Sequence, residues 1–515
     1  MYPALHARTH PQRPAFIMAD AGTATSYGEL DARSNRLAHL LRARGLRHRD
    51  HYAVFMENNR HYIVANAAGE RCGLYYTCIN SFLTARELAY IVDNSDSRVL
   101  ITSRAMRDVA AQALPLCPKL RLALIVDAPG DANFMNLDEA CAAFPATPIA
   151  DEFLGTPMLY SSGTTGRPKG VLRPLPDNPP REPLALFHFL AKLWRYRQDM
   201  VYLSPAPLYH SAPQAAVSLC IRFGGTAIIM EHFDPEHYLA LIEKYRVTHS
   251  QLVPTMFNRL LKLPEQVRKR YDLSSLDVAI HAAAPCPVQI KEKMIDWWGP
   301  IIHEYYGATE GLGFTACDSR EWLEHRGSVG KVMLGELHVL DEMMQPAAKG
   351  VPGEIWFKTA TPFEYFNDAL RTAQSRSADG SMTTVGDVGY VDDDGFLYLT
   401  DRSTFMIISG GVNIYPQECE NLLVTHAKVA DAAVFGVPNE DLGEEVKAVV
   451  QPMPGHEPGP ELEGELIAFC RQHLAALKCP RSIEFDPALP RLPTGKLYKK
   501  SLRDRYWTGK ANRIV

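Results

Sequence analysis

The sequence has little that would place the chain in a membrane or in an oxidising compartment. No apolar run approaches the length of a bilayer span, and the first residues, Met1–Arg8, lack the apolar core of a signal peptide. The ten cysteines are scattered without a Cys-x-x-Cys pair, so neither a zinc site nor a disulfide framework is indicated. The last residues, Asn512–Val515, are not a peroxisomal address. We therefore expect a cytoplasmic protein with reduced cysteines.

The chain also lacks an excess of positive charge, internal repeats and low-complexity segments. Its formal net charge is −5, which argues against a general nucleic-acid binder. Hydrophobic residues make up 46% and charged residues 22%, which is the profile of a globular protein. At 515 residues the chain is too long for one ordinary domain, so we expect at least two.

Helical and strand-like patterns alternate over the first half of the chain, and this alternation predicts α/β layers. The expected helices span 27–41, 84–92 and 235–245, and the expected strands span 51–56, 98–102, 225–230 and 247–253. The patterns fall into two blocks, which suggests two sheets. From about residue 327 to 399, short strands and turn signals predict a small β subdomain.

The last hundred or so residues have a pattern of their own. Strands are expected at 429–435 and 444–451, and helices at 416–423 and 461–477. We therefore predict an α/β fold in two domains. Residues 1–402 would form a large N-terminal domain of two layered subdomains and the small β subdomain, and residues 403–515 a smaller, mobile α+β domain.

The most informative segment is Tyr160–Val171, with the sequence YSSGTTGRPKGV. Glycines let a backbone approach a polyanion closely, and hydroxyls, exposed N–H groups and cations bind phosphate oxygens. The segment is not a Walker A loop, because its lysine follows a proline and precedes a glycine. We predict a phosphate-binding hairpin, with residues 167–197 forming a loop followed by a surface helix.

This segment resembles the phosphate loop of adenylate-forming enzymes, which include acyl-CoA synthetases, adenylation domains of peptide synthetases and luciferases. Further segments match the family in its usual order over nearly the whole chain. They are Pro207–Ala212, His281–Pro285, Tyr305–Gly311, Gly386–Tyr390, Asp401–Arg402, Ser409–Pro416 and Leu492–Lys496.

The resemblance implies a nucleotide site. Tyr306 would stack on adenine, Thr309 would hold the α-phosphate, and Asp387 would accept hydrogen bonds from the ribose hydroxyls. The nucleotide-binding residues implied in this way are Ser161, Ser162, Gly163, Thr164, Thr165, Gly166, Lys169, Ala283, Ala284, Pro285, Tyr305, Tyr306, Gly307, Thr309, Asp387, Leu399 and Arg402.

The resemblance also implies the groups that act on the substrates. Glu310 would bind Mg2+, which prefers carboxylate and phosphate oxygens, and Lys496 would bridge the acid and the α-phosphate. Together with Thr309 and His210 these residues form the expected catalytic set. The glycine loop, with Ser409, Gly410 and Gly411, would line the CoA channel, and the acyl pocket would include His210, Ala212, Ala282 and Gly311.

These residues predict an ATP-dependent acid:CoA ligase that forms an acyl-adenylate, releases pyrophosphate and then makes the acyl-CoA thioester. Its partners would be a carboxylic acid, ATP, Mg2+ and CoA, and the sequence leaves open whether the chain forms a homodimer. The pocket segments are small or apolar and offer no cation for a second carboxylate. An apolar fatty, aryl or steroid side-chain acid is therefore expected.

One residue departs from the family pattern. Thr404 stands where the family commonly has an aspartate or lysine as the hinge about which the small domain rotates between the two half-reactions. Threonine is β-branched and stiff, so turnover could differ.

Three other functions remain open on the sequence alone. An amino-acid adenylation enzyme would usually carry an aspartate in the pocket segment, where this chain has Tyr209-His210. A luciferase-like oxygenase would use the same adenylation residues. A catalytically dead nucleotide-binding protein is disfavoured because Glu310, Asp387, Arg402 and Lys496 are all present.

Overall fold

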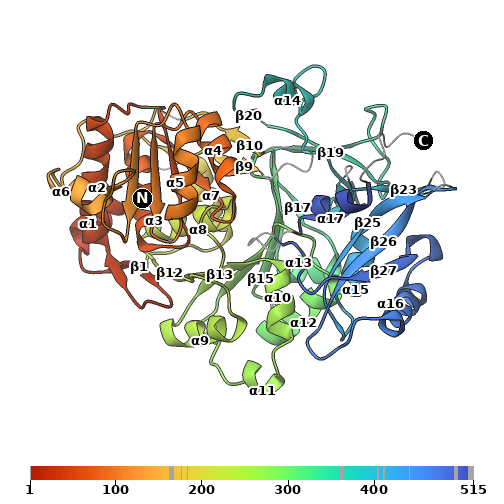
Figure 1. The fold of residues 1–515 in the computed structure, drawn as a ribbon. Coiled ribbons are helices and arrows are strands. Elements are labelled where there is room, and N and C mark those ends of the chain that lie inside the picture. Colours follow the sequence, from red (N-terminus) through yellow and green to blue (C-terminus); the bar gives the residue numbers. More distant parts are fainter. Residues whose placement is uncertain are drawn as a thin grey trace.

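Figure 1 shows a large part, from red to teal along the chain, beside a smaller blue part that ends in α17. This computed structural model describes residues 2–161, 168–175, 177–182, 184–359, 363–402, 405–409, 412–439, 441–491 and 497–507. Several predicted site residues lie outside these ranges, and for Arg402 only the backbone is described. The residues outside are Ser162, Gly163, Thr164, Thr165, Gly166, Thr404, Gly410, Gly411 and Lys496.

The first of the two predicted α/β layers is a six-stranded parallel sheet in the order β7-β6-β5-β3-β4-β8. Its inner strands read as continuous apolar runs because both faces are buried. The strands are β3 (His51–Phe55), β4 (Tyr75–Ile79), β5 (Val99–Ser103), β6 (Leu122–Val126), β7 (Met135–Asn136) and β8 (Thr156–Pro157). The helices that follow them in the chain include α3 (Arg60–Cys72), α4 (Ala85–Asn94), α5 (Arg107–Ala113) and α6 (Leu137–Ala142).

The second layer is a nine-stranded sheet in the order β17-β16-β15-β14-β13-β11-β12-β1-β2. Its strands are β1 (Pro14–Met18), β2 (Ala24–Ser26), β11 (Val201–Ser204), β12 (Thr226–Ile229), β13 (His249–Leu252), β14 (Val278–His281), β15 (Ile302–Tyr306), β16 (Phe314–Cys317) and β17 (Lys331–Leu334). Its helices include α1 (Pro3–Thr9), α2 (Tyr27–Ala43), α7 (Ala185–Leu193), α8 (Ser211–Phe223), α9 (Pro235–Tyr245), α10 (Pro254–Leu261), α11 (Glu265–Arg268), α12 (Val288–Trp298) and α13 (Ser319–Glu324). The two predicted sheets are thus confirmed.

The predicted β subdomain is also present, as a four-stranded antiparallel sheet in the order β18-β19-β21-β22. A separate three-stranded sheet, β20-β10-β9, carries the phosphate segment. Within residues 167–197 the prediction of a loop was wrong at 169–172, because Lys169–Leu172 forms a strand between two neighbours. The elements are β9 (Leu159–Ser161), β10 (Lys169–Leu172), β18 (Glu336–Leu340), β19 (Gly353–Lys358), β20 (Glu364–Tyr365), α14 (Ala369–Gln374), β21 (Asp387–Val391) and β22 (Leu397–Arg402).

The last segment of the chain folds around a fifth sheet with a hydrophobic core of its own. The long antiparallel pair β25 and β26 forms its centre, and β23, β24 and β27 extend it. The elements are β23 (Ile407–Ser409), β24 (Val412–Ile414), α15 (Gln417–Leu423), β25 (Val429–Asn439), β26 (Gly443–Pro452), α16 (Pro460–His473), β27 (Ser482–Phe485) and α17 (Lys499–Trp507). The predicted α/β class, with a smaller α+β unit at the C-terminal end, is confirmed.

Two expectations from the composition can be compared with the structure. All ten cysteines are free thiols; nine of them are buried and Cys286 is partly buried. Across the described part of the chain, none of the helices combines the length and the apolar character that crossing a bilayer needs.

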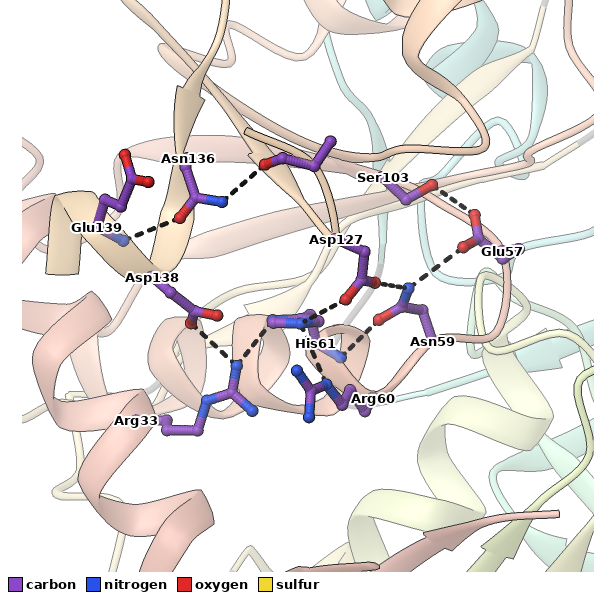
Figure 2. A network of polar contacts seen from close by, with 11 residues as sticks. Arg33, Glu57, Asn59, Arg60, His61, Ser103, Asp127, Asn136, Asp138 and Glu139 are labelled. Atoms are coloured by element: carbon purple, nitrogen blue, oxygen red, sulfur yellow. Dashed lines mark hydrogen bonds and ion pairs between the residues drawn. The ribbon is translucent and has the colours of Figure 1, made fainter. Parts of the chain in front are cut away.

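A polar network lies where β3, β5 and β6 of the six-stranded sheet end (Figure 2). At its centre, Arg33 donates a hydrogen bond to Nδ1 of His61 at 2.9 Å, and Nε2 of His61 lies 3.3 Å from Asp127. Asn59 donates to the same aspartate at 2.7 Å and caps α3 through the backbone N–H of His61. The network therefore ties the start of α3 to the loop that follows β6.

This network gives a pH-dependent stability. Burial, reinforced by the charge of Arg33, lowers the pKa of His61 from 6.5 to about 4, although Asp127 opposes the shift. His61 is thus neutral in the folded protein. Its contribution to the free energy of unfolding is complete above pH 6.5 and is lost as the pH falls towards 4. We expect the free energy of unfolding at pH 5 to be lower than at pH 7 by up to about 2 kcal/mol from His61. Urea titrations at both pH values, repeated on His61→Gln, would measure this; an equal pH dependence in the variant would contradict it.

Candidate active site

The predicted site segments follow the carboxyl ends of neighbouring strands. β11, β13, β14 and β15 are parallel neighbours, so their carboxyl ends lie at one edge of the nine-stranded sheet. The segments that begin at these strand ends or within three residues of them are Pro207–Ala212, Val253–Phe257, His281–Pro285 and Tyr305–Gly311. Residues that are widely separated in the sequence are therefore brought to one edge of the sheet.

The adenine segment begins as a strand end, as predicted, and then turns sharply. β14 ends at His281, and Ala283 has a φ of 74°, in the left-handed region that residues other than glycine rarely adopt. Ala282 is buried, whereas Ala283 is exposed and Ala284 and Pro285 are half-buried. The turn thus presents small side chains and accessible backbone.

Tyr305 and Tyr306 are consecutive in β15, so their side chains point to opposite faces of the sheet. The hydroxyl of Tyr306 donates to Oδ2 of Asp387 at 2.8 Å, so the structure brings the predicted adenine and ribose residues together. The side chain of Tyr305 stacks on Phe314, with 5.0 Å between ring centroids, and its hydroxyl accepts from Gln251 at 2.8 Å. The side chain of Tyr305 therefore lies on the face of the sheet opposite to that of Tyr306.

The strand that carries Asp387 also places two further predicted nucleotide residues. β21 and β22 are antiparallel, and Asp387 is paired in register with Arg402. Leu399 lies opposite Gly389 on the same pair of strands and packs against the hydrophobic cluster that contains Tyr306. The predicted ribose end of the site is therefore built on a single β-hairpin.

The carboxylate of Glu310 is nearly buried, with 8% of the residue exposed. Its Oε1 accepts a hydrogen bond from the hydroxyl of Tyr365 at 3.0 Å, and Nζ of Lys169 lies 4.8 Å from the centre of the Tyr365 ring. Lys169 pairs with Ser161 across the β9–β10 hairpin, which confirms that the phosphate segment starts and ends as a hairpin. Tyr365 thus connects the hairpin to the predicted metal ligand.

Arg173 is a functional candidate that the sequence reasoning missed. Its guanidinium donates a hydrogen bond to the carbonyl of Thr309, and a Cβ built on Gly311 would lie 3.5 Å from its Cζ. Burial lowers the pKa of Arg173, and the neighbouring charge of Glu310 opposes that shift. The guanidinium of Arg173 therefore lies close to Gly311, one of the predicted pocket residues, although the pocket segments themselves contain no arginine or lysine. No motif in the sequence marks Arg173.

A buried ionic cluster joins the two predicted nucleotide segments that follow β14 and β15. Nζ of Lys291 lies 2.5 Å from Oε2 of Glu304, and Nε2 of His281 lies 3.3 Å from the same oxygen. Burial alone would raise the pKa of Glu304, but its interactions with His281 and Lys291 hold it at about 2. His281 directly precedes Ala282, and Glu304 directly precedes Tyr305, so the cluster fixes the two segments relative to each other.

The remaining predicted residues are placed as follows. His210 is the N-cap residue of α8, with its ring 4.2 Å from that of Tyr209, and Ala212 lies in the first turn of the helix. Ser409 ends β23, which lies in Figure 1 at the far edge of the blue part of the chain. Its neighbours Ile408 and Val412 are about half exposed (50% and 47%). Ser409 itself is half-buried.

The side chains present are compatible with Mg2+ at Glu310. The described residues contain no group of three or more histidine, cysteine, aspartate or glutamate side chains that could hold a metal alone. Mg2+ typically keeps water and binds one or two carboxylates together with substrate phosphates, so one carboxylate beside a phosphate hairpin fits it.

Comparison with known proteins agrees with this geometry. The chain matches "AMP-binding enzyme" over residues 4–365 and "AMP-binding enzyme C-terminal domain" over residues 418–496. It is 31% identical, over 95% of both chains, to a 3-[(3aS,4S,7aS)-7a-methyl-1,5-dioxo-octahydro-1H-inden-4-yl]propanoyl:CoA ligase of Rhodococcus jostii. It is 33% identical, over 98% of both chains, to a feruloyl-CoA synthase of Amycolatopsis. ATP-bound MatB from Rhodopseudomonas palustris superposes with a TM-score of 0.80 at 28% identity, over 99% of both chains.

The chain therefore belongs to the family of AMP-binding enzymes, as the resemblance implied. Its near full-length relatives named as acid:CoA ligases confirm the predicted class within that family, an AMP-forming acyl-CoA synthetase that uses ATP and CoA.

Proposed function

We propose that the protein activates an apolar carboxylic acid, such as a fatty, aryl or steroid side-chain acid, and transfers it to CoA. The observation that carries this proposal is the pairing of Tyr306 with Asp387 beside the cluster of Glu310, Tyr365 and Lys169. Small residues at the pocket segments leave room for a bulky acid, and the two relatives above are named for ring-bearing acids.

The reaction joins two anions, and the proposed residues lower their repulsion. An oxygen of the acid attacks the α-phosphorus of ATP, the bond to the β-phosphate oxygen breaks, and pyrophosphate leaves. Lys169, Arg173 and Lys496 would supply positive charge, and Thr309 would orient the α-phosphate. Mg2+ held by Glu310 would neutralise phosphate charge. The CoA thiol, losing its proton, then attacks the acyl carbonyl and AMP leaves.

We also propose a division into two domains at residues 402 and 403, with Thr404 as the hinge. The end of β22 at Arg402, the start of the last sheet at Ile407 and the two family matches support it.

The proposal is tested by measuring pyrophosphate release with ATP and Mg2+ across a panel of acids, with and without CoA, on the wild type and on Lys496→Ala. We expect apolar acids to trigger release, CoA to accelerate it, and the variant to lose it. Release that CoA leaves unchanged would point to another acceptor. No release with any acid would refute adenylation.

Arg173 gives a prediction for the same assay. Arg173→Met should release pyrophosphate roughly tenfold more slowly, because the Thr309 carbonyl loses its charged donor and Glu310 loses a nearby positive charge. Arg173→Lys should be less affected, since it keeps the charge. The exposed Arg320→Met is the control. If Arg173→Met kept the wild-type rate, Arg173 would have no part in the reaction.

A further inference from the structure

Lys262 connects the large part of the chain to the last sheet. It is the C-cap residue of α10, and its ammonium donates to the carbonyl of Val429 at 2.6 Å and lies 3.5 Å from that of Ala430. In Figure 1, α10 lies on the side of the large part that faces the blue part. Val429 begins β25, so a half-buried lysine from one unit binds the first strand residues of the other.

The backbone of β25 is suited to this contact. β25 is an edge strand of its sheet, and the N–H of Met453 donates to the carbonyl of Lys428, so the carbonyl of the next residue, Val429, points away from β26. The ammonium group of Lys262 supplies a donor there. Burial lowers the pKa of Lys262, and the carboxylate of Asp431, two residues along β25, opposes that shift.

Asp431 continues the connection to the predicted lysine motif. Arg491 forms an ion pair with Asp431 through two of its nitrogens, with Nη2 at 2.5 Å from Oδ1. Arg491 forms an antiparallel bridge with Leu497, and the N–H of Tyr498 donates to the carbonyl of Pro490 at 2.7 Å. The two ends of the segment that carries Lys496 are thus held side by side on the strand that Lys262 contacts.

We propose that Lys262 is a positioning residue for adenylation, which seats the base of the Lys496 loop by binding the start of β25. This inference rests on the proposed role of Lys496. Lys262 touches no substrate, and its effect passes through Val429, Asp431 and Arg491. It should therefore matter for the attack on ATP and not for the attack of CoA on the finished adenylate.

The two half-reactions can be measured separately. Single-turnover pyrophosphate release from ATP and an accepted acid reports the first, and acyl-CoA formation from synthetic acyl-adenylate and CoA reports the second. We expect Lys262→Met to slow the first five- to twentyfold and to leave the second within twofold. Lys262→Arg should retain most of the first. Equal slowing of both, slowing of the second alone, or no change would overturn the proposal.

A matched control and a readout without catalysis complete the test. Lys269→Met removes an exposed lysine that pairs with Glu265 on the neighbouring helix, and it should change neither half-reaction. Hydrogen exchange of the peptides at 429–433 and 497–502 should speed up in Lys262→Met and not in Lys269→Met. Unchanged exchange would overturn the positioning role even if the wild type released no pyrophosphate, an outcome that would separately refute the proposed function.

Discussion

Glu310→Gln should release pyrophosphate about 100- to 1000-fold more slowly than the wild type, with nearly unchanged affinity for AMP. Glutamine has the same shape and can still accept the hydrogen bond from Tyr365, so the loop should keep its geometry. What is lost is the negative charge that would hold Mg2+ against the phosphates. Because AMP needs little of that charge, calorimetric titration with AMP separates binding from chemistry.

Tyr365→Phe is the matched variant for this prediction. It keeps the charge of Glu310 and removes only the hydrogen bond that orients one oxygen, so a loss of about tenfold is expected. If Glu310→Gln kept more than a tenth of the wild-type rate at saturating Mg2+, Glu310 would not be the metal ligand. The wild type and both variants should be compared over a Mg2+ titration.

Lys291→Met should lower the free energy of unfolding by about 3–5 kcal/mol. The variant leaves the buried carboxylate of Glu304 with only His281 beside it, and both Lys291 and Glu304 are almost fully inaccessible to water. Lys291→Met combined with Glu304→Leu should recover much of the loss, since no uncompensated charge then remains. Guanidinium titrations at pH 7 provide the measurement.

The exposed Lys293→Met, on the same helix, is the control and should change stability by less than about 0.5 kcal/mol. The pH dependence gives a second check on Glu304. Its folded pKa of about 2 lies below the ordinary value of 4.5, so its contribution is full above pH 4.5 and is lost as the pH falls towards 2. A Lys291→Met variant as stable as the wild type would show that the cluster has no structural weight.

The sequence predicted those parts of the fold that local patterns control. The helix expected at 235–245 is α9 with the same bounds, and the helix expected at 84–92 is α4, which begins with a capping box formed by Thr84 and Glu87. β1 was missed because this five-residue strand joins the sheet by pairing with β12, more than two hundred residues away, and with the short strand β2. Strand order and the three-stranded sheet depend on similarly distant pairings.

Only part of the candidate site could be predicted from the sequence. Tyr306 and Asp387 belong to recognisable segments, and the structure joins them although 81 positions separate them. Arg173 and Lys291 stand in segments without a motif, and their importance arises only when tertiary packing places them beside Thr309 and Glu304. The roles given to Lys496, Gly410 and Thr404 lie outside the described residues and stay predictions.

Because Asp387 pairs with Arg402, the length of β22 affects both the predicted nucleotide contacts and the position of the small domain. The strand ends at Arg402, beside the predicted ribose ligand Asp387, and only Ser403 separates Arg402 from the proposed hinge at Thr404. Deleting a single residue between Leu399 and Arg402 would turn the following side chains to the opposite face and shorten the path to the small domain at once. Nucleotide recognition and domain placement therefore cannot vary independently in this strand, and insertions that a surface loop would tolerate should be selected against here.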